Sequence, residues 1–260
     1  MLKALNTAAT GMQAQQTQMD VTANNMANLG TNGYKKQRAE FEDLMYQTIK
    51  EPGAATGDNA ISPLGVQSGL GVKTAAIRKD FGVGSANITN RPLDLMIEGK
   101  GFFTVQTDNG IAYTRDGAFT KDANGILADK NGHILQPQIV IPPEATGIGI
   151  SNRGVVEISL ANGERQNVGQ IELVNFINPA GLKSLGKNLY ANTPASGAPQ
   201  QGIPGLNSFG EIAQGHLEGS NVNIVDEMVN MIKTQRSYEI NSQACLLYTS
   251  DAADDGGGVV

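Results

Sequence analysis

One stretch comes close to a phosphate-binding loop: Gly181-Leu182-Lys183-Ser184-Leu185-Gly186-Lys187-Asn188. In such a loop, glycines let backbone amides surround the phosphates, and a final Ser or Thr hydroxyl holds Mg²⁺. Asn188 stands at that final position, and Pro194 soon afterwards argues against a long helix. Without a helix the loop has no helix dipole to attract phosphate. We therefore expect no nucleotide site and no cofactor.

A second stretch, Thr120 to Asn131, has Gly125 where a calcium-binding loop needs glycine. Thr120 and Asn131 stand where that loop needs its first carboxylate and its bidentate Glu, so a turn is the better interpretation. The only histidines, His133 and His216, are far apart in the sequence, which argues against a multi-His metal site. No acidic residue is singled out as catalytic. We expect neither a metal site nor an enzyme.

Composition narrows the class of protein further. The 260 residues carry 25 Asp and Glu against 19 Lys and Arg without a basic cluster, which disfavours nucleic acid as a partner. No apolar run is long enough to span a bilayer, so no direct membrane insertion is expected. The N-terminus lacks the apolar core and cleavage site of a secretory signal, which favours the cytoplasm or an export route without cleavage. The single Cys245 excludes an internal disulfide framework.

The elements that organise the chain lie at its two ends. Leu5, Met12, Met19 and Met26 fall seven residues apart. The second position of the same heptad holds Leu2, Ala9, Gln16 and Ala23. This pattern predicts a helix that packs along another helix, about 40 Å long at roughly 1.5 Å per residue.

The faces of this helix away from the stripe are almost uncharged. Between Ala4 and Tyr34 the only charged residue is Asp20. An exposed helix normally carries Lys and Glu on its wet face, whereas buried charges are costly. The composition therefore indicates a helix surrounded by protein, supplied by other copies of the chain. The alternative is an amphipathic helix that closes over its own domain.

Gly30 and Asn32-Gly33 are expected to end the helix, since both residue types tolerate the left-handed backbone of a C-terminal cap. A small basic step follows at Lys35, Lys36 and Arg38. It is either a solvated turn or a contact to an acidic neighbour.

The middle of the chain changes character twice. Residues 35–71 are Pro- and Gly-rich in their second half and predict an extended linker or a long hairpin. Within them, Phe41 to Ile49 fits a helix or an extended segment. Residues 72–214 show short apolar runs separated by five Asx-Gly pairs, a pattern typical of antiparallel strands joined by tight turns. The pairs are Asn109-Gly110, Asp116-Gly117, Asn124-Gly125, Asn131-Gly132 and Asn162-Gly163.

A second helix is predicted after Asn223, with Asp226 three residues later as in a capping box and with Met228 and Ile232 on its apolar side. The predicted fold class is α+β. The N- and C-terminal helices (1–34 with 215–244) form a coiled-coil-like pair, 35–71 connects, and 72–214 forms a central antiparallel β domain. We expect Leu5, Met12, Met19, Met26, Met228 and Ile232 to form the subunit-packing seam, and call them the seam residues.

Three stretches together resemble the bacterial flagellar rod and hook family. The first holds Asn24, Asn25, Asn28, Gly33 and Tyr34, in an Ala-Asn-Asn-Met-Ala-Asn core followed by a Gly-Tyr-Lys turn. The second joins Gly99-Lys100-Gly101-Phe102-Phe103 with Tyr113-Thr114-Arg115-Asp116-Gly117. The third runs from Leu217 to Asn241 and includes Asn221, Gln235, Arg236 and Tyr238. The resemblance covers nearly all of residues 1–244.

Chain length and the segments around Phe41 and Gly186 are most similar to the distal-rod branch; a proximal rod or hook paralogue is the alternative. The resemblance implies a self-assembling homopolymer, a hollow straight shaft that crosses the periplasm and carries torque to the hook. It also implies export through the growing channel without a cleaved signal. Proximal rod, hook and ring proteins are the implied neighbours. The alternative from a different class is a soluble β-domain carbohydrate binder or hydrolase.

The last residues, 245–260, depart from the family pattern. In the family the final helix continues with apolar spacing, whereas this chain ends in Gly256-Gly257-Gly258-Val259-Val260. Glycine disfavours a helix by about 1 kcal/mol relative to Ala. We expect this tail to be foreign to the natural protein; a divergent natural tail is the alternative.

Overall fold

The computed structural model describes residues 2–51, 55–57, 60–61, 64–161 and 163–254. The chain divides into two compact units, and each is described by itself. Unit 1 contains residues 1–26, 37–78 and 223–260, and unit 2 contains residues 27–36 and 79–222. The turn that follows the first helix therefore belongs to the β-rich unit, whereas the sequence prediction grouped residues up to 34 with the helices.

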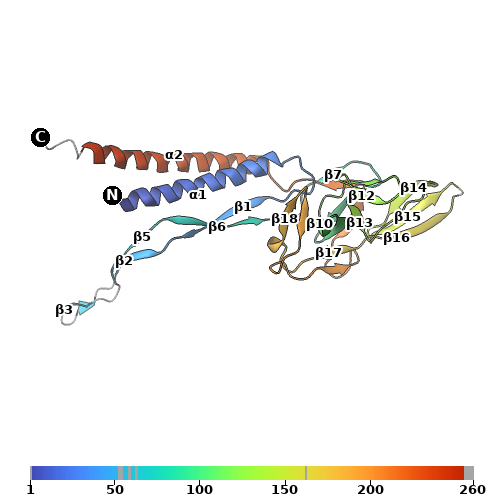
Figure 1. The fold of residues 1–260 in the computed structure, drawn as a ribbon, viewed down its shortest axis with the longest axis horizontal. Helices are drawn as coiled ribbons and strands as arrows, with labels where there is room; N and C mark the ends of the chain where they lie inside the picture. Colours follow the sequence, from blue (N-terminus) through green and yellow to red (C-terminus); the bar gives the residue numbers. More distant parts are fainter. Residues whose placement is uncertain (1, 52–54, 58–59, 62–63, 162, 255–260) are drawn as a thin grey trace. The chain divides into compact units, whose positions relative to one another are not determined.

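Unit 1 is built on two helices, α1 (Leu2–Ala27) and α2 (Ile224–Asp254). Figure 1 shows them side by side, with the N-terminus of α1 next to the C-terminal part of α2. A Cβ added at Gly11 would lie 3.0 Å from the Asn241 side chain, and Asn25 donates a hydrogen bond to Glu227. From one contact to the next, the residue number increases along α1 and decreases along α2, so the two helices run antiparallel.

Helix α2 begins where the sequence predicted. The Asn223 side chain accepts a hydrogen bond from the Val225 amide at 3.0 Å, as an N-cap does. Asp226 and Glu227 lie in the first turn, where their negative charges interact favourably with the positive end of the helix dipole. The helix continues through Asp254, past the predicted start of the foreign tail at Cys245. The triple glycine lies outside the described residues.

A long hairpin completes unit 1. Strand β1 (Gln37–Asp43) pairs with β6 (Val72–Lys79), β2 (Tyr46–Lys50) pairs antiparallel with β5 (Val66–Gly69), and β3 (Ala55–Gly57) pairs antiparallel with β4 (Ala60–Ile61). Of the two alternatives for residues 35–71, the hairpin is therefore correct, and Phe41 to Ile49 is mostly extended. The hairpin is tied to α1, because the Thr10 hydroxyl lies 3.4 Å from the Val72 amide that donates to it.

Unit 2 is organised around the antiparallel pair β9 (Phe102–Thr107) and β10 (Gly110–Thr114). The main sheet has the order β11-β12-β13-β9-β10-β19-β18, and β17 also pairs with β9 and with β20. The remaining bounds in this sheet are β11 Phe119–Lys121, β12 Leu127–Asp129, β13 Ile134–Gln136, β17 Leu173–Asn175, β18 Lys183–Gly186, β19 Leu189–Ala191 and β20 Gln200–Gly202.

Smaller sheets complete unit 2. Strands β14 (Ala145–Ile150), β15 (Val155–Leu160) and β16 (Arg165–Gln170) form an antiparallel meander. Two further antiparallel pairs join β8 (Leu95–Glu98) to β21 (Glu211–Gln214) and β7 (Ala86–Ile88) to β22 (His216–Glu218). A short 3-10 turn, η1 (Pro179–Gly181), precedes β18. The predicted α+β class with an antiparallel β body is confirmed.

Two apolar clusters form the core of unit 2. The larger is mainly aliphatic and includes Ile97, Val105 and Leu135, each fully buried. The smaller is aromatic: Phe102, Tyr113, Phe176 and Tyr190 lie near one another, and their ring pairs meet edge to face, as aromatic quadrupoles prefer.

The Asx-Gly pairs serve two different purposes. Gly110, Gly125, Gly132 and Gly163 have positive φ angles, as tight turns require. Asn162 lies outside the described residues. Gly117 is not among the glycines with a positive φ angle. A Cβ there would lie 1.7 Å from the Leu95 carbonyl oxygen, so this glycine permits a close approach of two backbone segments.

Candidate assembly surface

The contact between α1 and α2 is made by small and polar side chains. On α2, Glu227, Thr234 and Asn241 are spaced seven apart, and the first two are buried. On α1, Asn25 meets Glu227 and Gly11 lies against Asn241. Side chains two turns apart share one face of a helix, so the α2 face that meets α1 is the polar one.

Asn25 joins three elements of unit 1. Its side-chain amide donates to the Gln37 carbonyl at 2.8 Å, and its side-chain oxygen accepts from the Gln37 amide at 2.9 Å. The same amide donates to Glu227 at 3.2 Å. Asn25 is only 1% exposed, so these hydrogen bonds satisfy a buried polar group and fix the ends of α1, β1 and α2 together.

The apolar side of α2 is exposed. Val225 is 63% exposed, Met228 50%, Val229 43% and Ile232 56%. We call these four residues the α2 stripe. Four neighbouring aliphatic side chains on one face of a helix form an apolar patch that water does not favour, and such patches mark interaction sites.

The seam residues occupy intermediate positions in the single chain. Leu5, Met12, Met19 and Met26 on α1 are half-buried, and Met228 and Ile232 on α2 are exposed. The second position of the predicted heptad is open to solvent, because Ala9, Gln16 and Ala23 are exposed. The role of the seam residues in subunit packing stays a prediction.

A buried charge cluster lies in unit 2. Lys35 Nζ is 2.6 Å from Glu218 Oε1, and Arg115 Nη1 is 3.4 Å from Glu218 Oε2. We call Lys35, Arg115 and Glu218 the charge cluster; all three side chains are at most 2% exposed. Burial lowers the pKa of Lys35, and the charge of Glu218 opposes that shift. Burial likewise lowers the pKa of Arg115, against the same opposing charge.

The charge cluster ties the turn after α1 to the strand before α2. The Gly33 amide donates to the Glu218 carbonyl at 2.8 Å, next to the ion pair that Lys35 makes with that residue. Gly33 has φ +68, and a Cβ there would lie 2.8 Å from the Asp116 amide nitrogen, so only glycine fits. Asn221 adds a second link, since its side-chain oxygen accepts from the Lys36 amide at 2.7 Å.

The other family-motif residues lie in several environments. Tyr34 is buried, Asn28 accepts a hydrogen bond from the Thr31 hydroxyl at 3.1 Å, and Asn24 is exposed. On α2, Gln235 and Tyr238 are exposed, and Arg236 is 3.1 Å from Glu239 in an exposed ion pair.

Sequence reasoning did not single out the charge cluster. The one signal was the basic step at Lys35, Lys36 and Arg38, for which a contact to an acidic neighbour was one alternative. That alternative is correct for Lys35, whereas Lys36 is half-buried and Arg38 is exposed. Arg115 and Glu218 are separated from Lys35 by many residues, so their meeting depends on the complete fold.

The stretches considered for nucleotide or calcium binding form strands and turns. The Gly181–Asn188 segment contains β18, and the Thr120–Asn131 segment spans the turn between β11 and β12. Among the residues that the structure describes, no group of three or more His, Cys, Asp or Glu side chains is placed to hold a metal ion. In the same residues, neither helix is long and apolar enough to cross a membrane.

Comparison with known families gives the class of protein. Residues 5–35 match the family "Flagella basal body rod protein", residues 96–158 match "Flagellar hook protein FlgE/F/G D1 domain", and residues 213–245 match "Flagellar basal body rod FlgEFG protein C-terminal". These are structural proteins of the bacterial flagellum, and they are not enzymes.

Individual curated relatives show to which family of flagellar proteins the chain belongs. The chain is 47% identical over 255 residues to the flagellar basal-body rod protein FlgG of Borreliella burgdorferi, and 46% identical over 254 residues to that of Buchnera aphidicola subsp. Schizaphis graminum. In both comparisons 96% of each chain is covered. It is 36% identical to the rod protein FlgF of Caulobacter vibrioides, over 90% of this chain and 89% of that one. The chain therefore belongs to the flagellar basal-body rod protein family, as a structural subunit.

A solved structure of the Helicobacter pylori flagellar hook protein FlgE2 is 16% identical, with a TM-score of 0.24 over 70% of this chain and 43% of that one. The family assignment rests on the sequence relatives.

Proposed function

We propose that the chain is a distal-rod subunit that assembles by one head-to-tail contact repeated along a screw axis. Such a contact does not close on itself, so it produces a filament. The filament is a hollow, straight shaft that transmits motor torque to the hook and forms part of the export channel. The two FlgG relatives at 46% and 47% identity, against 36% for FlgF, favour the distal branch over its proximal paralogue.

The observation that carries this proposal is the exposure of the α2 stripe. Its four aliphatic side chains are between 43% and 63% exposed, although the polar face of the same helix is covered by α1. Burying apolar surface contributes roughly 25 cal/mol per Å². A second copy that covers the α2 stripe therefore supplies a driving force for assembly.

Helix α1 supports the same conclusion, because Lys3 and Asp20 are its only charged residues. We propose that Leu5, Met12, Met19 and Met26 complete their burial against neighbouring copies in a coiled-coil-like layer lining the channel. The predicted terminal domain (1–34 with 215–244) would form this layer. Residues 47–71 would bridge subunits and stiffen the shaft.

The neighbours of the shaft follow from this role. Other copies of the chain are the main partner, with proximal rod proteins, the hook protein and the surrounding ring proteins at the ends and outside. The shaft would cross the periplasm, and its subunits would be exported by the flagellar type III apparatus without a cleaved signal. A chain without a disulfide framework passes more easily through such a channel.

The test is to place a charge in the α2 stripe. Met228→Asp should abolish rod formation while the β body stays folded, because an uncompensated carboxylate resists burial in an apolar contact. Met19→Asp should have the same effect from the α1 side. The matched control is Ile111→Asp, which places the same charge on an exposed aliphatic position of the β body. The measurement is electron microscopy of purified basal bodies, with circular dichroism as the folding check. Normal rods from folded Met228→Asp protein would contradict the proposal.

A further inference from the structure

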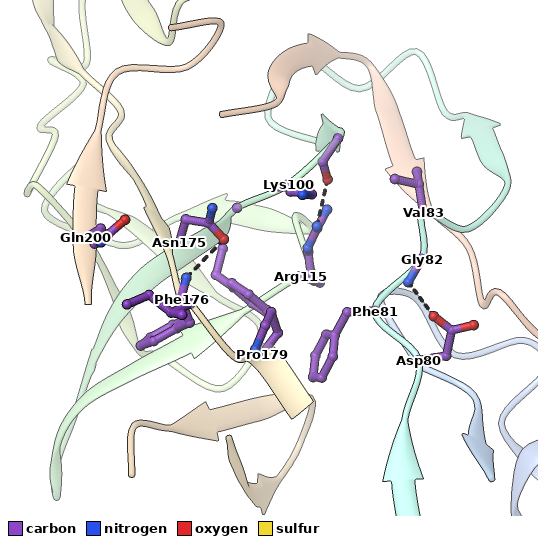
Figure 2. Close-up of a pocket in the computed structure, with 14 residues that line it drawn as sticks. Asp80, Phe81, Gly82, Val83, Lys100, Arg115, Asn175, Phe176, Pro179 and Gln200 are labelled. Atoms are coloured by element: carbon purple, nitrogen blue, oxygen red, sulfur yellow. Dashed lines mark hydrogen bonds between the residues drawn. The ribbon is translucent and has the colours of Figure 1, made fainter. Parts of the chain in front are cut away.

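A groove of about 600 Å³ lies on the surface of unit 2. Its walls combine aromatic and aliphatic side chains with charged and amide ones, and Figure 2 shows Phe81 and Phe176 with Arg115 and Lys100 around the same space. Phe81, Phe102 and Phe176 belong to or pack against the aromatic core cluster, so the walls are held by the fold.

Arg115 lines this groove, and hydrogen bonds to the fold hold its guanidinium in place. Its Nη1 donates to the Ile97 carbonyl and to Glu218, and its Nη2 donates to the Gly99 carbonyl at 2.7 Å. Its Nε is buried and has no acceptor among the described residues, although the side chain is only 2% exposed and lines the groove. The hydrogen bonds of Nη1 and Nη2 hold the positive charge of Arg115 beside the groove.

The charge around the groove is positive. Lys100 and Arg115 line it, and Lys35 donates to the carbonyl of Gly82 in its wall at 2.6 Å. The opposing carboxylates are Asp80 in the wall and Glu218 in the charge cluster, so one cationic side chain is in excess. The whole chain carries a net charge of −6. An acidic ligand therefore complements the groove better than a basic or neutral one.

The rim of the groove is apolar and open. Val83 is 46% exposed and Ile177 is 78% exposed. Exposed aliphatic side chains around a partly polar floor favour a peptide that offers apolar side chains together with an acidic group.

We propose that this groove receives the segment Phe41–Met45 of a second copy of the chain. This inference rests on the proposed self-assembly. Glu42 and Asp43 are consecutive exposed carboxylates, and they lie between Phe41, 37% exposed, and Met45, 82% exposed. The segment spans the end of β1 and the two residues after it, and it offers its exposed side chains from the hairpin. Glu42 is 3.2 Å from Lys73, but both side chains are more than half exposed, and such a surface pair is easily exchanged.

The acidic pair Asp226-Glu227 fits less well. It lies in helix α2, and Glu227 is buried against Asn25. Residues 41–45 are therefore the occupant to which the groove is assigned.

The experiment uses a fluorescein-labelled peptide of residues 39–47 and the full-length chain, with binding measured by fluorescence anisotropy. The peptide should bind the wild-type chain and lose affinity about tenfold or more toward Ile177→Glu, which places a like charge at the rim. The control variant is Ile111→Glu, 56% exposed on the same unit outside the groove. A peptide carrying Glu42→Gln and Asp43→Asn should bind correspondingly weakly. Equal binding to all proteins, equal binding of both peptides, or no binding, would overturn the assignment.

The same assay separates this inference from the proposed function. Met228→Asp should fail to form rods and still bind the peptide with wild-type affinity, because the α2 stripe and the groove are different surfaces. Normal rods from Met228→Asp together with peptide binding would refute the α2 stripe and leave the groove assigned. Rods blocked by Met228→Asp without any peptide binding would refute the groove alone.

Discussion

At the scale of single residues, Glu218 is the side chain that pairs the buried cations of unit 2. One carboxylate faces both Lys35 and Arg115, and none of the three side chains is more than 2% exposed. Isolated buried charges are costly, so each cation depends on this carboxylate. The Glu218 carboxylate also accepts a hydrogen bond from the Gly84 amide at 3.0 Å. Its backbone carbonyl accepts another from the Gly33 amide. It therefore holds a turn from the start of the chain to a strand near its end.

Replacing Glu218 by Gln should reveal this dependence. The amide keeps the size of the side chain but leaves two buried cations without a counter-charge, which should lower the free energy of unfolding by about 3–5 kcal/mol. The control is Glu239→Gln, which breaks the exposed pair with Arg236 and should change it by less than about 0.5 kcal/mol. Urea titration followed by circular dichroism measures both. Equal effects would mean that the charge cluster is not important for stability.

At the scale of elements, the sequence patterns predicted the features that depend on residues close together in the sequence. Helix α1, the N-cap at Asn223 and antiparallel strands joined by tight turns were predicted from the sequence and are confirmed, whereas the packing role of the heptad stripe stays a prediction. The hairpin was left open between two alternatives because β1 and β2 find their partners in β6 and β5, more than fifteen residues further along. Pairing over such a distance leaves no periodic signal in either strand alone.

The helix pair shows the same limit. The sequence located the apolar side of α2 and predicted that it would be a packing surface. It did not predict that the polar side, with Glu227 and Asn241, is the one that meets α1. That choice depends on Asn25, whose hydrogen bonds to Gln37 and Glu227 orient both helices.

Replacing Asn25 by Ala tests this role within unit 1. It removes three hydrogen bonds in a buried site, which should lower the local stability by roughly 2–4 kcal/mol. Hydrogen exchange of the Gln37 amide should become correspondingly faster. Gln16→Ala, on an exposed position of the same helix, serves as the control and should leave that rate unchanged. An unchanged Gln37 rate in Asn25→Ala would show that another contact fixes the start of β1.

At the scale of the whole molecule, the two units differ in how completely their apolar side chains are buried. Unit 2 has its own aliphatic and aromatic cores. Unit 1 has paired helices with an exposed α2 stripe and a hairpin with exposed side chains such as Met45 and Ile49. Family membership identifies the protein as a structural subunit, and the unequal burial of the two units explains why it would need its own copies.

The sequence-based domain division rested on composition, because the N-terminal helix has little charge and the β region is rich in turns. The predicted boundary at residue 34 stays a prediction; the compact units divide after residue 26 and after residue 36. The turn at Gly33–Lys35 belongs with unit 2 because its hydrogen bonds and ion pair go to Glu218. A boundary set by contacts that are distant in sequence cannot be read from local composition.

The most direct test of the central claim is methionine oxidation, compared between the dilute chain and assembled rods by mass spectrometry. Met228 is 50% exposed and should form the sulfoxide readily in the dilute chain, because exposure governs this reaction. In rods it should be protected by about tenfold or more if a second copy covers the α2 stripe. Met96, 3% exposed in the core of unit 2, should be protected in both states and serves as the internal control. Equal oxidation of Met228 in the dilute chain and in rods would contradict the account.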